Sequence, residues 1–143
     1  MVTIRAYDDC DYESVRRNLI EGKLYEQVWD SRENLATKIN RDPDSILVAE
    51  VDGQVVGSVY IMADGWSAFI YRLVVSMGAR QHGIGTRLME TAEEQLRSKG
   101  VPEVALFVNA DNTELQRWYE KRGYGGTHLF RCMWKALTKG GQQ

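Results

Sequence analysis

The sequence predicts a mixed α/β fold with a mostly antiparallel sheet, in the order β-α-α-β-β-β-α-β-α-β. Two observations carry this prediction. Asp52-Gly53 separates two β-rich runs, which is the signature of a two-residue hairpin turn. Further along, Ile84, Leu88 and Leu96 recur at multiples of four positions, which is typical of one helix face. Hairpin-linked strands combined with amphipathic helices indicate a mixed sheet covered by helices.

The first 75 residues predict one strand, two helices and an antiparallel meander. Residues 2–6 alternate apolar and polar side chains, as a strand does. Asp11 and Ser31 are suitable N-caps for two helices with apolar faces, the first of which stops at Gly22. The predicted meander strands cover residues 46–51, 55–62 and 68–75, with Asp64-Gly65 as the second turn.

The second half of the chain predicts alternating helices and strands. A helix opens after Gly83 and stops at Gly100, and residues 104–108 form an apolar run expected to be a buried strand. Asp111 and Glu114 resemble a capping box for a helix that Gly123 ends. Residues 128–137 alternate and predict the last strand.

Composition bounds the possible functions. The chain has 143 residues, 43% of them apolar, and a net charge of −2. We expect one domain over residues 1–138 with a loose tail at 139–143. The absence of net positive charge argues against a nucleic-acid partner. Without a long apolar run or signal peptide we expect a cytoplasmic protein with no membrane association, and Cys10 and Cys132 as reduced thiols. No metal site is predicted.

The segment around Gly83 and Gly85 predicts an anion site. A strand runs into a glycine-containing loop that opens a helix, so backbone N–H groups and the helix dipole can meet a diphosphate. Arg80, Arg87 and the Thr86 hydroxyl can supplement them. The Gly-Lys-Ser/Thr of a nucleotide-binding P-loop is absent. A dinucleotide-binding enzyme stays an open alternative, although its fingerprint lacks a third glycine here.

Three blocks resemble the GNAT superfamily of acetyl-CoA-dependent N-acetyltransferases. Arg80-x-x-Gly83-x-Gly85 after an apolar strand resembles its motif A. The later block Asn112-x-x-Leu115-x-x-x-Tyr119-x-x-x-Gly123-Tyr124 is similar to a second family block, and Met133-x-Lys135-x-Leu137 to its closing strand. The resemblance covers nearly the whole chain and implies a GNAT-like sheet with helices on both faces.

The resemblance also implies a binding site for acetyl-CoA as cosubstrate. The backbone of Leu73, Val74 and Val75 would pair with the pantetheine arm, which a splay between the fourth and fifth strands would admit. Asn112 would hold the cosubstrate, and the Tyr119 hydroxyl would lie near its sulfur. The residues implied to surround the pyrophosphate are Arg80, Gln81, His82, Gly83, Ile84, Gly85 and Thr86.

The implied reaction is direct attack of a primary amine on the thioester. The backbone N–H of Val75 would polarise the carbonyl, and Tyr119 would protonate the leaving thiolate. Relatives carry a glutamate base where this sequence has Phe69 or Phe107. The base is therefore unassigned: the candidates are Tyr60, Asp64, Tyr71 or a water chain.

The acceptor is unknown from sequence. Residues 22–31 are expected to line its site, and the short connection after Gly123 suggests an open cleft or one that a second copy completes in a homodimer. An open cleft would suit a protein or peptide amine, and the aromatic and acidic residues in this segment slightly favour a small cationic amine. These residues are Tyr25, Glu26, Trp29 and Asp30.

Blander interpretations stay open. Asn112 can be only a helix cap and Tyr119 only a core tyrosine. The alternative function is a non-catalytic acyl-CoA-binding regulatory module, which the unassigned base keeps open.

Overall fold

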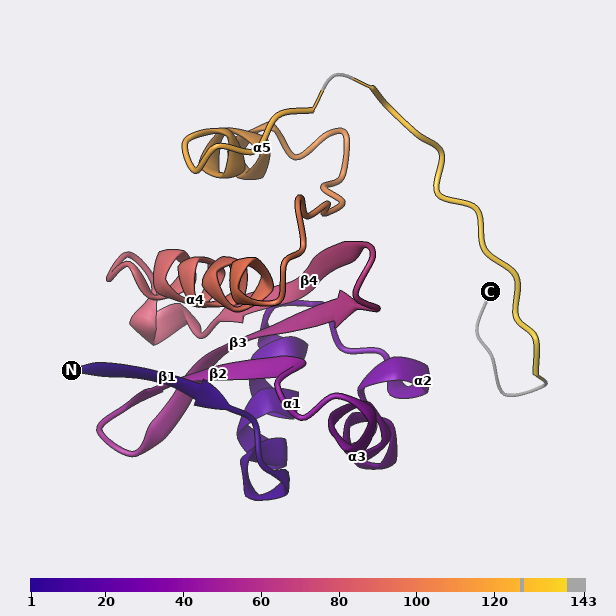
Figure 1. Ribbon diagram of the computed structural model, residues 1–143. Coiled ribbons are helices and arrows are strands. Elements are labelled where there is room, and N and C mark those ends of the chain that lie inside the picture. Colours follow the sequence, from indigo (N-terminus) through magenta and orange to yellow (C-terminus); the bar gives the residue numbers. More distant parts are fainter. Residues whose placement is uncertain (127, 139–143) are drawn as a thin grey trace. The chain divides into compact units, whose positions relative to one another are not determined.

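The computed structural model describes residues 1–126 and 128–138 and separates them into two compact units (Figure 1). The first unit is Met1–Ala105 and the second begins at Leu106. The predicted tail at 139–143 lies outside the described residues, and a single domain over 1–138 stays a prediction.

The first unit is built on a four-stranded antiparallel meander. Its strands are β1 (Val2–Ala6), β2 (Ile46–Val51), β3 (Gln54–Ala63) and β4 (Ala68–Val75), in that spatial order. At the β2–β3 turn, Asp52 and Gly53 have φ of 50° and 78°. Both values are positive, as the two-residue hairpin requires. The predicted meander and its turn are confirmed.

Six helical segments accompany this sheet. Asp11 precedes α1 and Gly22 ends it, as predicted, although Asp11 makes no side-chain cap bond to that helix. The Ser31 hydroxyl accepts a hydrogen bond from the N–H of Asn34 and caps α3, also as predicted. The segments are 3₁₀ helices η1 (Asp9–Asp11) and η2 (Met77–Ala79), α1 (Tyr12–Glu21), α3 (Arg32–Arg41), α4 (Ile84–Ser98), and a short α2 (Gln27–Asp30) that the sequence did not predict.

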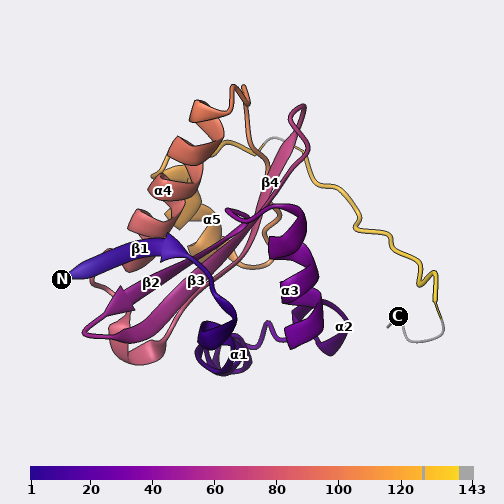
Figure 2. The same cartoon turned by 60° about the horizontal axis from the view of Figure 1, so that its bottom comes forward.

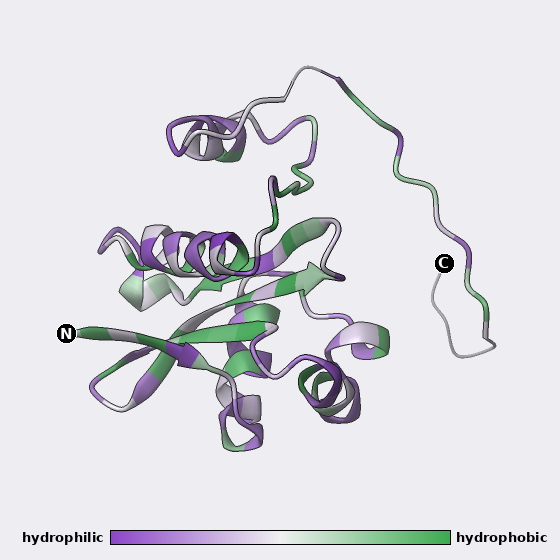
Figure 3. Cartoon of the chain, viewed as in Figure 1, coloured by the Kyte–Doolittle hydropathy of each residue, from purple (hydrophilic) through white to green (hydrophobic). Residues whose placement is uncertain are grey.

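The sheet is buried on both faces, with α1 and α3 on one side and α4 on the other (Figures 1 and 2). Ile46 and Val48 of β2 join a core cluster with residues of α1 and α3. Because successive strand side chains point to opposite faces, the buried Leu47 between them lies on the α4 side. Figure 3 shows the resulting hydrophobic colouring along the strands.

A glycine on β3 lets α4 approach the sheet closely. A Cβ atom at Gly57 would lie 3.0 Å from the Val74 carbonyl oxygen and 3.2 Å from Leu88 Cδ1. Leu88 belongs to α4 and Val74 to β4, so the missing side chain makes room for both. The first turns of α4 are thereby fixed against β3 and β4, next to the loop that leads into the helix.

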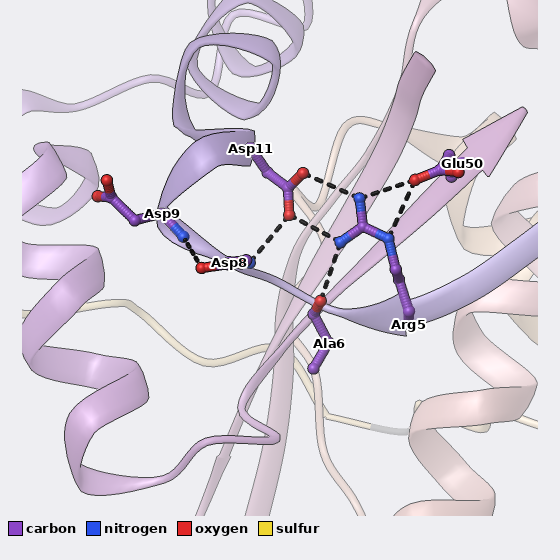
Figure 4. Close-up of polar contacts among 6 residues, drawn as sticks. All are labelled: Arg5, Ala6, Asp8, Asp9, Asp11 and Glu50. Atoms are coloured by element: carbon purple, nitrogen blue, oxygen red, sulfur yellow. Dashed lines mark hydrogen bonds and ion pairs between the residues drawn. The ribbon is translucent and has the colours of Figure 1, made fainter. Parts of the chain in front are cut away.

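In the first unit, every N–H donor of the Arg5 guanidinium has a hydrogen-bond acceptor (Figure 4). Arg5 on β1 donates to Asp11 from Nη1 and Nη2 at 2.8 and 2.9 Å, and to Glu50 from Nη2 and Nε at 2.8 and 3.1 Å. Its remaining N–H reaches the Ala6 carbonyl at 3.2 Å. The guanidinium therefore joins β1, η1 and β2, and it uses all five of its donors.

The second unit contains α5 (Thr113–Glu120). Its N-cap is Asn112, whose side-chain oxygen accepts from the Leu115 N–H at 3.1 Å, so the predicted Asp111 capping box is wrong by one position. Gly123 has φ of 93°, which agrees with the predicted helix stop. The Tyr119 ring packs edge-on against Trp118 and Tyr124.

Two predicted strands do not form in the described part of the chain. In residues 104–108 only Ala105 pairs, through a single parallel bridge to Phe69. Residues 128–137 keep the alternating pattern, visible in Figure 3, but they contain no assigned strand. Alternation fixes which side each residue faces, whereas a strand also needs a partner backbone, and beyond the Phe69–Ala105 bridge the described residues offer none to these two segments.

No helix in the described ranges is long and apolar enough to cross a membrane.

Candidate active site

The loop between β4 and α4 has the backbone geometry of an anion site. Gln81 and Gly83 have φ of 70° and 73°, in the left-handed region. Gly83 is the N-cap of α4 and supplies no side-chain cap. The N–H groups of Ile84 and Gly85 donate to no acceptor in the described residues. Unpaired donors at a helix N-terminus attract negative charge, so the loop suits a diphosphate.

Several contacts fix this loop. The Met77 N–H donates to the Glu21 carboxylate at 2.6 Å, which ties η2 to the end of α1. Arg80 Nε donates to the Val75 carbonyl at 3.0 Å. Arg87, expected to supplement the anion site, instead donates from Nη1 to the Val2 carbonyl at 2.7 Å, so this N–H has a structural partner.

The predicted pantetheine-binding residues lie on an edge strand. Leu73, Val74 and Val75 are on β4, which ends the sheet order and pairs with β3 along one side. On its other side, the described residues provide only the Phe69–Ala105 bridge. An extended ligand can therefore add along this strand, as the sequence predicts for the pantetheine arm.

The register of β4 shifts next to these residues. Ser58 and Tyr60 of β3 oppose Val74 and Tyr71 of β4, so two residues of β4 face one of β3. Arg72 stands in this bulge with φ of 59°, which is rare for a side chain with a Cβ atom. Arg72 is not among the predicted site residues, although a charged residue within an apolar strand was a signal that could have pointed to it.

Asp30 is the partner of Arg72 and is fully buried. Its carboxylate accepts from the Tyr60 hydroxyl at 3.0 Å, the Glu26 N–H at 2.8 Å and Arg72 Nε at 3.3 Å. The expectation that Asp30 binds a cationic acceptor is therefore wrong, because each of its oxygens already has a protein donor and neither reaches solvent.

None of the three side chains predicted as possible bases is suited to accept a proton from the amine at neutral pH. Burial raises the pKa of Tyr60 and of Tyr71, which reduces the fraction of phenolate. The Asp64 side chain accepts the N–H groups of Trp66 and Ser67 at 2.9 Å in an exposed turn, and these bonds lower its pKa. The candidate that fits these surroundings best is the water chain.

The predicted site residues fall into two groups. Leu73 to Val75 and the loop residues Arg80 to Thr86 lie on one continuous stretch of the first unit. Asn112 and Tyr119 lie together on α5 in the second unit. Asn112 acts as a helix cap through its oxygen, and burial raises the pKa of the Tyr119 phenol, which favours its protonated form.

No cluster of three or more His, Cys, Asp and Glu side chains that could hold a metal occurs among the residues described.

Comparison with known proteins gives the family. The sequence matches the family described as "Acetyltransferase (GNAT) family" over residues 8–124. The chain belongs to this family. A protein named acetyltransferase from Pectobacterium atrosepticum is 36% identical over 121 residues, which are 85% of this chain and 86% of that protein. An acetyltransferase from Sodalis glossinidius is also 36% identical, over 85% of each protein.

Solved structures agree with this assignment. Ard1 from Thermoplasma volcanium is similar with a TM-score of 0.78 and 28% identity, covering 89% of this chain and 84% of that one. The fold is also that of the PaiA N-acetyltransferase from Thermoplasma acidophilum, solved in complex with coenzyme A, with a TM-score of 0.75, 22% identity, and 85% and 88% covered. The predicted family, fold class and acetyl-CoA-dependent acetyltransferase activity are confirmed.

Proposed function

We propose that this acetyltransferase moves the acetyl group of acetyl-CoA to a primary amine by direct attack in a ternary complex. One observation carries the proposal: the loop before α4 presents unpaired N–H groups of Ile84 and Gly85 beside an edge strand. A diphosphate at the loop and an extended arm along β4 are the two parts of coenzyme A that such a surface fits.

The chain's residues would act by position. Acetyl-CoA, when bound, supplies an acetyl group activated as a thioester. The loop residues Arg80 to Thr86 would hold the pyrophosphate, and the backbone of Leu73 to Val75 would align the arm. Holding amine and thioester in one cleft replaces a bimolecular encounter by a positioned one. The Val75 N–H would donate to the carbonyl oxygen as negative charge develops on it.

Proton transfer completes the reaction. The N–C bond forms, the C–S bond breaks, and coenzyme A leaves as a thiol. The Tyr119 hydroxyl, kept protonated by burial, would give a proton to the sulfur. The amine would lose its proton through water. Asn112 would contact the cosubstrate through its amide N–H groups, since its oxygen caps α5.

The test is release of free thiol from acetyl-CoA, measured with and without a panel of primary amines. We expect amine-dependent release, and Tyr119→Phe is expected to lower kcat by about tenfold or more with a smaller change in acetyl-CoA affinity. The non-catalytic alternative predicts acetyl-CoA binding without amine-dependent release. That result, with the whole panel, would overturn the proposed reaction.

A small-molecule acceptor is part of the proposal, with a cytoplasmic location and a homodimer as further predictions. Sedimentation of the purified chain tests the homodimer: a single monomeric species at assay concentration would contradict it.

A further inference from the structure

The bulge of β4 lies directly before the predicted arm-binding residues. In the β4 bulge, Tyr71 and Arg72 both contact groups on the α1–α3 side of the sheet. The Tyr71 ring packs edge-on against Tyr60, at 5.5 Å between ring centroids, and Arg72 Nε lies 3.3 Å from Asp30. A bulge that re-aims a side chain at a strand edge is typical of binding sites.

The Arg72 guanidinium is anchored at one end only. Nε bonds to Asp30, which is itself held by Tyr60 and the Glu26 backbone. Nη2 lies 3.9 Å from the Glu26 carboxylate, which is an ion pair but too long for a hydrogen bond. Within the described residues no acceptor takes a hydrogen bond from Nη1 or Nη2. The four N–H groups at the outer end are thus without an acceptor on a side chain that is 17% exposed.

The outer N–H groups of this guanidinium can bind an anion of matching shape. The outer end of the guanidinium has no protein acceptor in the described residues, and its planar pair of Nη groups matches a carboxylate in a bidentate arrangement. Because Asp30 locks Nε, the direction of the outer edge is preset, so a ligand would not have to order the side chain. The buried Asp30 also keeps the guanidinium in place when no ligand is present.

The position of Arg72 on β4 relates its free N–H groups to the acceptor. With the pyrophosphate on residues 80–86 and the thioester carbonyl at the Val75 N–H, the acetyl end points along β4 toward Arg72, three residues before Val75 in the chain. Resting on the proposed function, we propose that Arg72 binds the carboxylate of the acceptor, and that the acceptor is a small amine that also carries a carboxylate, such as an amino acid. This replaces a purely cationic acceptor held by Asp30.

The charge of Glu26 allows a test in which carboxylate affinity should rise on substitution. Its carboxylate, 48% exposed, lies beside Nη2 and opposes a bound anion. Removing its charge in Glu26→Gln should strengthen binding of a carboxylate that has no ammonium group. Unchanged carboxylate affinity in Glu26→Gln would contradict a carboxylate bound at Arg72 beside this side chain.

Two measurements test the proposal on the full chain. The first is thiol release from acetyl-CoA with amino acids and with their carboxamides, which differ by one charge. The second needs no turnover: calorimetric binding of N-acetyl amino acids and their amides to the protein saturated with coenzyme A. We expect at least one amino acid to exceed its amide by about tenfold in kcat/KM, and its N-acetyl form to bind correspondingly tighter.

The variants separate recognition from folding. Arg72→Lys keeps the charge beside Asp30 but lacks the bidentate edge, and it should lose most of the preference, with the acid-to-amide ratio of kcat/KM falling toward one through a higher KM for the acids. Arg97→Lys on the exposed face of α4 is the matched control. The inference is overturned if kcat/KM and affinity are equal within every acid and amide pair, or if the preference for the acid survives Arg72→Lys. If amines are acetylated without such a preference, only this inference fails; if no amine releases thiol, the proposed function fails, and the binding measurement still decides on Arg72.

Discussion

Two arginines on strands of the same sheet, each beside two carboxylates, are used in opposite ways. Arg5 gives all five N–H groups to Asp11, Glu50 and the Ala6 carbonyl. Arg72 gives one N–H, to Asp30. The first guanidinium is complete without a ligand and stabilises the corner where β1, η1 and β2 meet. The second is oriented but incomplete, as a binding group should be.

The backbone shows the same difference. Arg5 stands in regular antiparallel pairing, opposite Val48. Arg72 and Gln81, at the bulge and in the loop after β4, have φ of 59° and 70°. Strain in non-glycine residues persists where surrounding contacts enforce it and gathers at functional sites. The Arg5 corner therefore serves stability, while the stretch from Arg72 to Gly85 combines strain with unpaired donors.

The largest effect is expected when the anchor of Arg72 is removed. Asp30→Asn leaves a nearly buried guanidinium without its main counter-charge, and we expect unfolding to require about 3 kcal/mol less free energy. Urea denaturation of the variant and of the exposed control Asp44→Asn measures this. A loss of stability equal to that of the control would show that Asp30 does not hold Arg72.

The next largest effect is the loss of stability expected when Arg5, whose N–H groups are all hydrogen-bonded, is replaced. Arg5→Met leaves Asp11, whose side chain is 6% exposed, without its cation and should lower the free energy of unfolding by about 2 kcal/mol. Affinity for acetyl-CoA should not change while the protein is folded. Arg97→Met is the control. Weakened cosubstrate binding at unchanged stability would contradict the division between the two regions.

A smaller effect is expected on the stability of the fold at acidic pH, through Asp11. Burial raises the pKa of Asp11, but the hydrogen bonds from Arg5 and the Asp8 N–H and the charge of Arg5 outweigh it, so the net pKa is lowered. A lowered folded-state pKa stabilises the fold fully above the unfolded value of about 4, and this stability is lost as pH falls through the folded value.

The stability difference between wild type and Arg5→Met should therefore shrink as the pH falls from 7 to 3. Denaturation curves at both pH values measure it. A difference that stays constant would mean that Asp11 is not stabilised through Arg5.

The smallest effect tests the strain in the loop. Gln81→Gly removes a Cβ atom from a left-handed residue and should raise the free energy of unfolding by about 0.5 kcal/mol, since relief of strain exceeds the greater freedom of unfolded glycine. Arg5→Gly, in regular strand geometry, should instead destabilise. A destabilised Gln81→Gly would contradict strain at this position.

Local chemistry explains what the sequence predicted correctly. Asp52-Gly53 and Ser31 specify a hairpin and a helix cap through neighbouring atoms, so both were predictable. The backbone form of the loop before α4 is also local, because Gly83 directly opens the helix, whereas diphosphate binding there stays a prediction. Residues 104–108 needed a distant partner strand to pair beyond Ala105, and alternation alone does not supply one.

Nonlocal burial explains what the sequence missed. Beside Trp29, Asp30 looks like an accessible acid, yet distant Tyr60 and Arg72 cover and bind it. The four-residue α2 is too short to show a helical period. The bulge at Arg72 has no glycine or asparagine to mark it, because the strain is held by tertiary contacts.

The central claim is that the loop from Arg80 to Thr86 binds the diphosphate of acetyl-CoA. It is tested most directly by calorimetric titration of wild type, Gly85→Glu and Gly85→Gln with acetyl-CoA. An acidic residue in the first helical turn is favourable for the helix, so Gly85→Glu should fold. We expect binding by wild type, a loss of about 100-fold or more in Gly85→Glu, and a clearly smaller loss in the uncharged variant. Equal affinity of wild type and Gly85→Glu would mean that the diphosphate does not lie on this loop.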